Sequence, residues 1–183
     1  TGIRGNGVIA ECYISNGLPG FDIVGLPDAA VKEARERVRA AAKNSGLTFP
    51  ASRITVNLAP ADLRKEGSGF DLPIAVAILA AMQQVEPEAL DEVAFVGELS
   101  LDGSVRGVKG VLPITAEARE QGFKRIYVPE ENAVEAAVVE GIEVLPVSSL
   151  KQVALSLCGE AVIEPVVAEV ADVVEQGEYA EDF

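Results

Sequence analysis

Histidine and tryptophan are missing from this chain of 183 residues, and its two cysteines, Cys12 and Cys158, lie far apart. Without histidine or a C-x-x-C pair, zinc sites of the His/Cys type cannot be assembled. We therefore expect two reduced core cysteines in a cytosolic protein. Aromatic residues are also scarce, with six Phe and three Tyr, so Val, Ile, Leu and Ala must fill the core.

Long apolar runs are missing as well. The longest, residues 72–82, has 11 residues, whereas a membrane-spanning helix needs about 20. No basic-then-apolar leader opens the chain. These features predict a buried helix at 72–82, a cytoplasmic location and no membrane partner.

Basic residues are nearly absent from the last third of the chain. The net charge is −14, yet residues 1–127 hold 14 Lys and Arg against 16 Asp and Glu. Residues 128–183 hold Lys151 alone against 13 acids. The body of the protein is therefore close to neutral and can carry a local basic face.

Strand and helix patterns alternate over residues 1–159, which predicts one domain of the α/β (α+β) class with a mixed sheet. Strands are expected at 8–15, 21–24, 53–58, 94–101, 104–108, 125–128 and 142–146. Helices are expected at 28–44, 71–84, 113–121, 130–140 and from Ser148 or Ser149 to 157, with Asp28 and Asp71 as N-caps. Residues 160–183 contain eight acids and no base, so we expect an acidic linker there.

Three blocks of sequence carry a family resemblance. They are GFDIVGLPDAAVKEARERVRAA at 20–41, ITVNLAPADLRKEGSGFDLPIA at 54–75 and FVGELSLDG at 95–103. They resemble the Mg-chelatase-like AAA+ ATPases of the ComM/YifB family, and the match extends over nearly the whole chain to Gly159. The resemblance implies a ribosomal S5 domain 2-like fold, which the proteolytic domain of Lon shares. Residues 126–132 (IYVPEEN) look especially Lon-like.

The resemblance also implies a division of labour. No G-x-x-x-x-G-K-[ST] motif occurs in the chain, so ATP and Mg are expected in an AAA+ module beyond residues 160–183, and no cofactor is expected in this domain. We expect the chain to be the N-terminal part of a longer protein, with its own AAA+ module and neighbouring subunits of a homo-oligomeric ring as partners.

Three functions follow for this domain. The first is a non-catalytic accessory domain in DNA processing (branch migration in natural transformation) that helps ring assembly and contacts DNA. The second is an assembly scaffold without DNA contact. The third is a displaced Ser–Lys peptidase.

The peptidase hypothesis depends on four positions. Aligning the Lon pattern places Gly69 where the nucleophilic serine belongs and Leu112 where the lysine belongs, so both members of the dyad are missing. Ser68 and Lys109 are one and three positions away. A nucleophile and its base must lie within hydrogen-bond reach, and we expect this pair not to.

A glycine-rich turn precedes the expected helix at 71–84. Gly67, Ser68 and Gly69 could present backbone N–H groups to a phosphate. Asp71 is expected to cap the same amides and to repel an anion, so a tight turn with an Asp-capped buried helix is favoured.

The expected helix at 28–44 carries a basic stripe. At 100° per residue, Lys32, Arg35, Arg39 and Lys43 lie within about 80° of one another. One interpretation is a solvated face with ion pairs such as Glu33–Arg37 and Glu36–Arg39. The other is a DNA-phosphate surface, to which Arg64 and Lys65 of the following loop would add; such binding would be independent of sequence and sensitive to salt.

Overall fold

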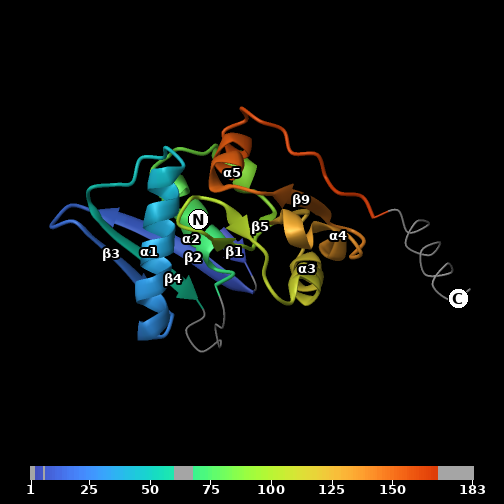
Figure 1. The fold of residues 1–183 in the computed structure, drawn as a ribbon, viewed down its shortest axis with the longest axis horizontal. Helices are drawn as coiled ribbons and strands as arrows, with labels where there is room; N and C mark the ends of the chain where they lie inside the picture. The colour runs from blue at the N-terminus through green and yellow to red at the C-terminus, as the bar shows by residue number, and fades with distance from the viewer. Residues whose placement is uncertain (1–2, 6, 60–67, 169–183) are drawn as a thin grey trace, which may run out of the picture.

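The computed structural model describes residues 3–5, 7–59 and 68–168. Within these residues, seven strands form one mixed sheet in the order β3-β4-β2-β1-β5-β8-β9 (Figure 1). The strands are β1 (Ile3–Gly5), β2 (Val8–Ser15), β3 (Gly20–Val24), β4 (Arg53–Ala59), β5 (Val93–Phe95), β8 (Arg125–Pro129) and β9 (Glu143–Val147). The pairs β1–β2 and β2–β4 are antiparallel and the other neighbouring pairs are parallel.

The helices cover the two faces of the sheet unequally. They are α1 (Asp28–Asn44), α2 (Asp71–Ala81), α3 (Val111–Glu120), α4 (Ala133–Ala136) and α5 (Leu150–Leu157), with short 3₁₀ turns η1 (Pro87–Leu90) and η2 (Glu130–Asn132). Successive side chains of β8 point to opposite faces: Tyr127 packs with α1, α2 and α5, whereas Ile126 and Val128 pack with α3 and α4. The predicted α/β fold with a mixed sheet is confirmed.

Among the described residues, no helix packs on the second face of β2, β3 and β4. The cluster that contains α3 and α4 includes residues of β5, β8 and β9 but none of β2, β3 or β4. On that uncovered side, Tyr13 is 58% exposed and Val24 is 52% exposed. The two ends of the sheet therefore present different surfaces to a partner.

The apolar run at 72–82 forms a buried helix, as predicted. Every residue of α2 from Asp71 to Leu79 is buried, because the helix lies under α1 and against the sheet. A helix that is apolar all round has no solvent face to present. This segment is therefore the centre of the larger core.

The expected strand at 94–101 is divided into β5 and a separate strand, β6 (Glu98–Leu99), which pairs with β7 (Val105–Arg106) around the predicted turn at Asp102 and Gly103. The division has a hydrogen-bonding cause. The Gly97 carbonyl accepts the Leu72 N–H at 3.0 Å, and the Gly97 N–H donates to the Gly69 carbonyl at 3.1 Å. The backbone at Gly97 thus bonds the start of α2 instead of continuing the ladder.

Other local predictions had mixed outcomes. Ser149 caps α5 as predicted, because its side chain accepts the Gln152 N–H. The Asp28 prediction was wrong: Pro27 is the N-cap of α1, Asp28 is the first helical residue, and no side chain bonds the cap. The predicted helix at 130–140 is shorter, consisting of η2 and α4.

The described part of the expected linker lies against the domain. Ile163 packs against the cluster of α1, α2 and α5. The Val166 N–H donates to the Val144 carbonyl of β9 at 2.9 Å, and Val166 packs on the side of α3 and α4. Residues 160–168 therefore cross the outer edge of β9. Residues 169–183 lie outside the described residues.

The cysteines are less alike than expected. Cys12 packs against the larger core, whereas Cys158 is exposed, so the prediction of two core cysteines was right only for Cys12. Both are free thiols. In the described part of the chain, no helix has the length and apolar character to cross a membrane.

Candidate functional site

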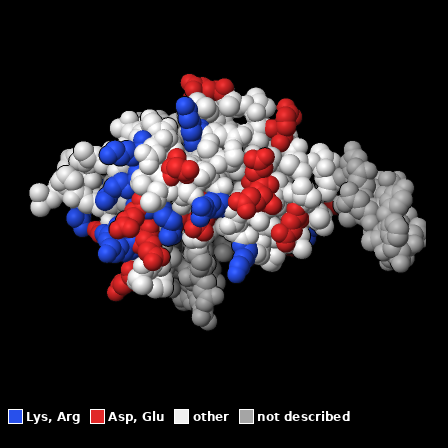
Figure 2. All heavy atoms as spheres, viewed as in Figure 1, with Lys and Arg blue, Asp and Glu red and all other residues white. Residues whose placement is uncertain are grey.

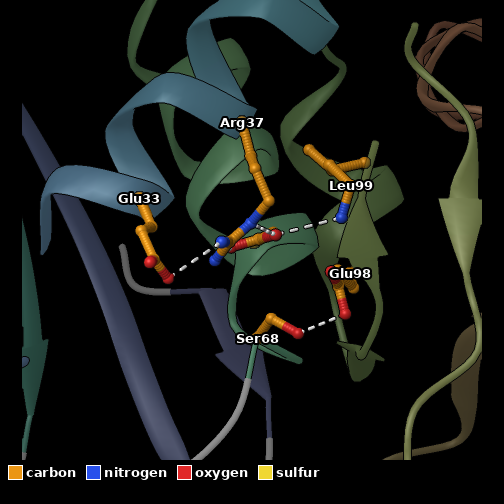
Figure 3. Close-up of polar contacts among 6 residues, drawn as sticks. Glu33, Arg37, Ser68, Glu98 and Leu99 are labelled. Carbon is orange, nitrogen blue, oxygen red and sulfur yellow. Dashed lines mark hydrogen bonds and ion pairs between the residues drawn. The ribbon is translucent and has the colours of Figure 1, made fainter. Parts of the chain in front are cut away.

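An ion pair between half-buried Arg37 and a buried carboxylate joins α1 to α2 beside the glycine-rich turn (Figure 3). Arg37 Nε and Nη2 donate to the Asp71 carboxylate at 2.7 and 3.1 Å, and the Leu99 N–H donates to the same carboxylate at 3.0 Å. Asp71 is 1% exposed. Glu33 adds a longer contact to Arg37, at 3.8 Å. Three segments far apart in sequence therefore meet at one carboxylate.

The prediction that Asp71 caps its own helix was wrong. Phe70 is the N-cap of α2, and no side chain makes a cap hydrogen bond there. A carboxylate taken out of water needs a cation and further donors, and Arg37 and Leu99 supply them. Burial raises the pKa of Asp71 above its ordinary value, while the bonds from Arg37 and Leu99 oppose that rise. The bond to Asp71 raises the pKa of Arg37 in turn.

The start of α2 offers a poor phosphate site, for reasons other than a capping aspartate. The Asp71 N–H donates to the Ser68 carbonyl and the Leu72 N–H donates to the Gly97 carbonyl, and Pro73 has no N–H to give. The Ser68 hydroxyl donates to the Glu98 carboxylate. The carboxylates of Asp71 and Glu98 would repel an anion here, and the backbone N–H groups of Asp71 and Leu72 already have acceptors. Gly67, the first residue of the turn, lies outside the described residues.

The positions that correspond to the Lon dyad do not form a catalytic pair. Gly69 has no side chain, and Leu112 is 38% exposed. Ser68 bonds a carboxylate, and among the described residues no lysine contacts its hydroxyl. Lys109 is exposed to solvent, whereas a lysine base needs burial to lower its pKa. The geometry gives the displaced Ser68–Lys109 dyad no support.

The IYVPEEN segment has a role that the sequence did not reveal. Asn132 Oδ1 accepts the Val108 N–H at 2.8 Å, and its Nδ2 donates to the Val108 carbonyl at 3.1 Å. Glu131 accepts the Gly107 N–H at 3.0 Å. These bonds hold the loop between β7 and α3. The Lon-like appearance of the segment was the only available signal, and it gave no partner.

The basic stripe of α1 divides into two kinds of side chain. Lys32 and Lys43 are exposed, and among the described residues neither has an ion-pair partner. Arg35 is half-buried and donates to the Phe21 carbonyl at 3.1 Å. The Arg39 guanidinium is exposed and lies 5.9 and 5.7 Å from the ring centres of Phe21 and Phe49.

The two ion pairs predicted for α1 had different outcomes. Glu33–Arg37 is present. Glu36–Arg39 is not among the ion pairs of the described residues, since Arg39 turns to the two rings. On the face of the molecule drawn in Figure 2, Lys and Arg gather over the half that contains α1, with acids among them. Asp and Glu predominate over the half that contains α3 and α4. Arg64 and Lys65, also predicted for this surface, lie outside the described residues.

No metal site is evident in the described part of the chain, where no three His, Cys, Asp or Glu side chains gather to hold an ion. An open groove of about 450 Å³ lies beside the ion pair, lined by residues that include Arg37, Glu98, Asp102 and Arg106. Glu98 bonds Ser68 and Asp102 bonds Ser104. Both carboxylates of the groove therefore already accept hydrogen bonds from serine side chains.

Comparison with known proteins assigns the family. The sequence profile described as subunit ChlI of Mg-chelatase matches residues 10–132. The chain belongs to this family. YifB of Escherichia coli (strain K12) is 46% identical over 163 residues, which cover 89% of this chain and 32% of YifB. Competence protein ComM of Haemophilus influenzae (strain Rd) is 49% identical over 138 residues, or 75% of this chain and 27% of ComM.

A more distant similarity supports the fold. The archaeal Lon protease of Methanocaldococcus jannaschii is 31% identical over 88 residues, which cover 48% of this chain and 13% of that protease. The resemblance to ComM/YifB and the Lon-like fold are both confirmed. This ChlI-family chain is a domain related to AAA+ ATPases, and it spans about a third of the length of the relatives YifB and ComM.

Proposed function

We propose that this ChlI-family domain is a non-catalytic accessory domain of a AAA+ ATPase in DNA processing, and that the outer face of α1 contacts DNA phosphates. The observation that carries the proposal is the pair Lys32 and Lys43, exposed on one stripe without an ion-pair partner among the described residues. They are 11 residues apart, or about 16 Å along a helix. ATP and Mg would bind in the module of the longer relatives that this chain does not span.

The interaction expected from this face is electrostatic and independent of sequence. Arg39 is also exposed, which gives three solvent-facing cations on the stripe. Three phosphate contacts on duplex DNA give a slope of about −2.7 in log K against log salt. Raising the salt from about 50 to about 200 mM should then weaken binding roughly 40-fold.

Fluorescence anisotropy with single-stranded, duplex and branched DNA tests the proposal. The variant Lys32→Glu/Lys43→Glu should lose binding at low salt. Lys124→Glu/Lys151→Glu is the matched control, because both residues are exposed, lie outside α1 and change the net charge equally. If the two variants bind as the wild type does, or lose binding equally, the α1 face is not the DNA surface.

An assembly scaffold is the second candidate. The uncovered side of β2, β3 and β4 exposes Tyr13 and Val24, and the tip between β2 and β3 exposes 84% of Leu18. These apolar groups are available for a contact with another domain or subunit. Self-association that persists at high salt, together with no binding to any DNA form, would favour this function over DNA contact.

A further inference from the structure

The outer face of α1 is a helix face without a partner in the described chain. Its inner residues Ala34, Val38, Ala41 and Ala42 are buried. On the outer side, Lys32 and Lys43 have no ion-pair partner among the described residues. A lone surface lysine is ordinary. Two on one stripe, with Arg39 between them, make a surface that can receive an acidic partner.

A surface of opposite charge lies at the other end of the molecule. Residues 130–140, which contain η2, α4 and the turn after it, form what we call the α4 face. On this face, Val134 is 70% exposed and Val138 is 54% exposed. Glu130, Glu135 and Glu140 lie close to this apolar pair in sequence and are exposed. None of these three carboxylates takes part in an ion pair among the described residues. In Figure 1, α1 and α4 lie on opposite sides of the view, which matches the separation of basic and acidic groups in Figure 2.

We propose that the α1 face of one copy docks on the α4 face of a second copy of this chain. Each copy carries both surfaces, so one contact type can join successive copies. The cations of α1 would face Glu130 and Glu135, and Val134 and Val138 would be buried at the centre. Opposite charges set the orientation of such a contact and exclude a contact between two α1 faces. The contact joins two different surfaces, so it repeats head to tail and closes into a ring if the rotation allows.

The docking also regulates DNA binding by the α1 face, and this part of the inference rests on the proposed function. The α1 cations are the ones assigned to DNA, so the neighbour's acidic face and DNA compete for them. Removing the acidic face should free α1 for DNA. Removing the α1 cations should weaken both interactions.

A charge-swap experiment tests the docking. The variants are Lys32→Glu/Lys43→Glu and Glu130→Lys/Glu135→Lys. Glu131 is left unchanged because it bonds Gly107. Sedimentation velocity without DNA is run at about 10 mM ionic strength, where the Debye length is about 30 Å, and at about 150 mM, where it is about 8 Å. Circular dichroism checks that each variant is folded.

The wild type should associate at low ionic strength, and each variant alone should associate about tenfold more weakly, because two facing pairs become repulsive. An equimolar mixture of the two variants should regain association, since each then offers the charge that the other needs. A wild type that stays monomeric at low ionic strength, or a mixture as weak as the separate variants, overturns the docking.

The DNA arm separates this inference from the proposed function. Anisotropy is measured on Glu130→Lys/Glu135→Lys, whose α1 face is intact. If this variant loses association and keeps DNA binding, both proposals are supported. Rescued association in the mixture with no DNA binding by any variant supports the docking and overturns the proposed function. If Lys32→Glu/Lys43→Glu loses DNA binding but the mixture shows no rescued association, the proposed function is supported and the docking is overturned.

Discussion

Removing Arg37 should destabilise the fold strongly, because it leaves the Asp71 carboxylate buried without its cation. Asp71 is 1% exposed, and Arg37 donates two of the three hydrogen bonds that its carboxylate accepts from the described residues. Breaking a buried ion pair from one side costs about 3–5 kcal/mol. We expect Arg37→Met, which keeps much of the side-chain volume, to lower the free energy of unfolding by that amount. Urea denaturation followed by circular dichroism measures it.

The double variant Arg37→Met/Asp71→Asn separates charge burial from lost packing. Its asparagine can still accept the Leu99 N–H, and no charge remains buried. The loss should therefore fall to about 1–3 kcal/mol, the cost of unmade hydrogen bonds. Equal destabilisation of Arg37→Met and the double variant would refute the reasoning, since the buried charge would then contribute nothing.

The pH dependence gives an independent check with a defined sign. Burial raises the pKa of Asp71 in the folded protein. Stability from a group with a raised pKa is present at low pH and lost as the pH rises through the folded value. In Arg37→Met the opposing cation is gone, so the destabilisation relative to wild type should shrink as the pH falls from about 7 toward about 4. The double variant has no titrating group at position 71, so its destabilisation relative to wild type should not shrink over the same range.

Two further predictions concern the loop before α3 and the thiols. Asn132→Ala should lower the free energy of unfolding by about 1–3 kcal/mol in urea denaturation, because the half-buried N–H and carbonyl of Val108 both lose their Asn132 partner. Glu135→Ala, at an exposed neighbour, should change stability little, and equal effects would contradict the role of Asn132. Burial raises the pKa of Cys12 to about 11. At about pH 8, iodoacetamide should therefore modify the exposed Cys158 well before Cys12, which peptide mass spectrometry of timed samples would show. Faster modification of Cys12 would contradict its burial.

Residues with a local signal were predicted well. The alternation in β2 and β4, the apolar run of α2 and the serine cap of α5 each depend on neighbours in sequence. The motif around Gly25 also has a local meaning that the structure explains. Gly25 has φ +106°, and a Cβ there would meet the Leu58 carbonyl oxygen at 2.3 Å. A side chain at this position would clash with the backbone of β4.

The candidate site was predicted only in part. The sequence identified Lys32 and Lys43 as members of one stripe, since helical spacing alone places them together. It did not predict that Arg39 would lie over Phe21 and Phe49, because those rings come from outside the helix. The proposed head-to-tail partner depended on α4, whose exposed valines have no unusual pattern in sequence.

The sequence by itself determined the α/β class, most of the strands and helices, and the family, because each follows from residue identity and short spacing. The tertiary structure decided which polar groups meet. Asp71 was expected to bond its own helix, yet its carboxylate meets Arg37, 34 residues away in sequence. The physical reason is that burial removes water from the carboxylate, and only the packed fold determines which cation and which backbone donor replace it.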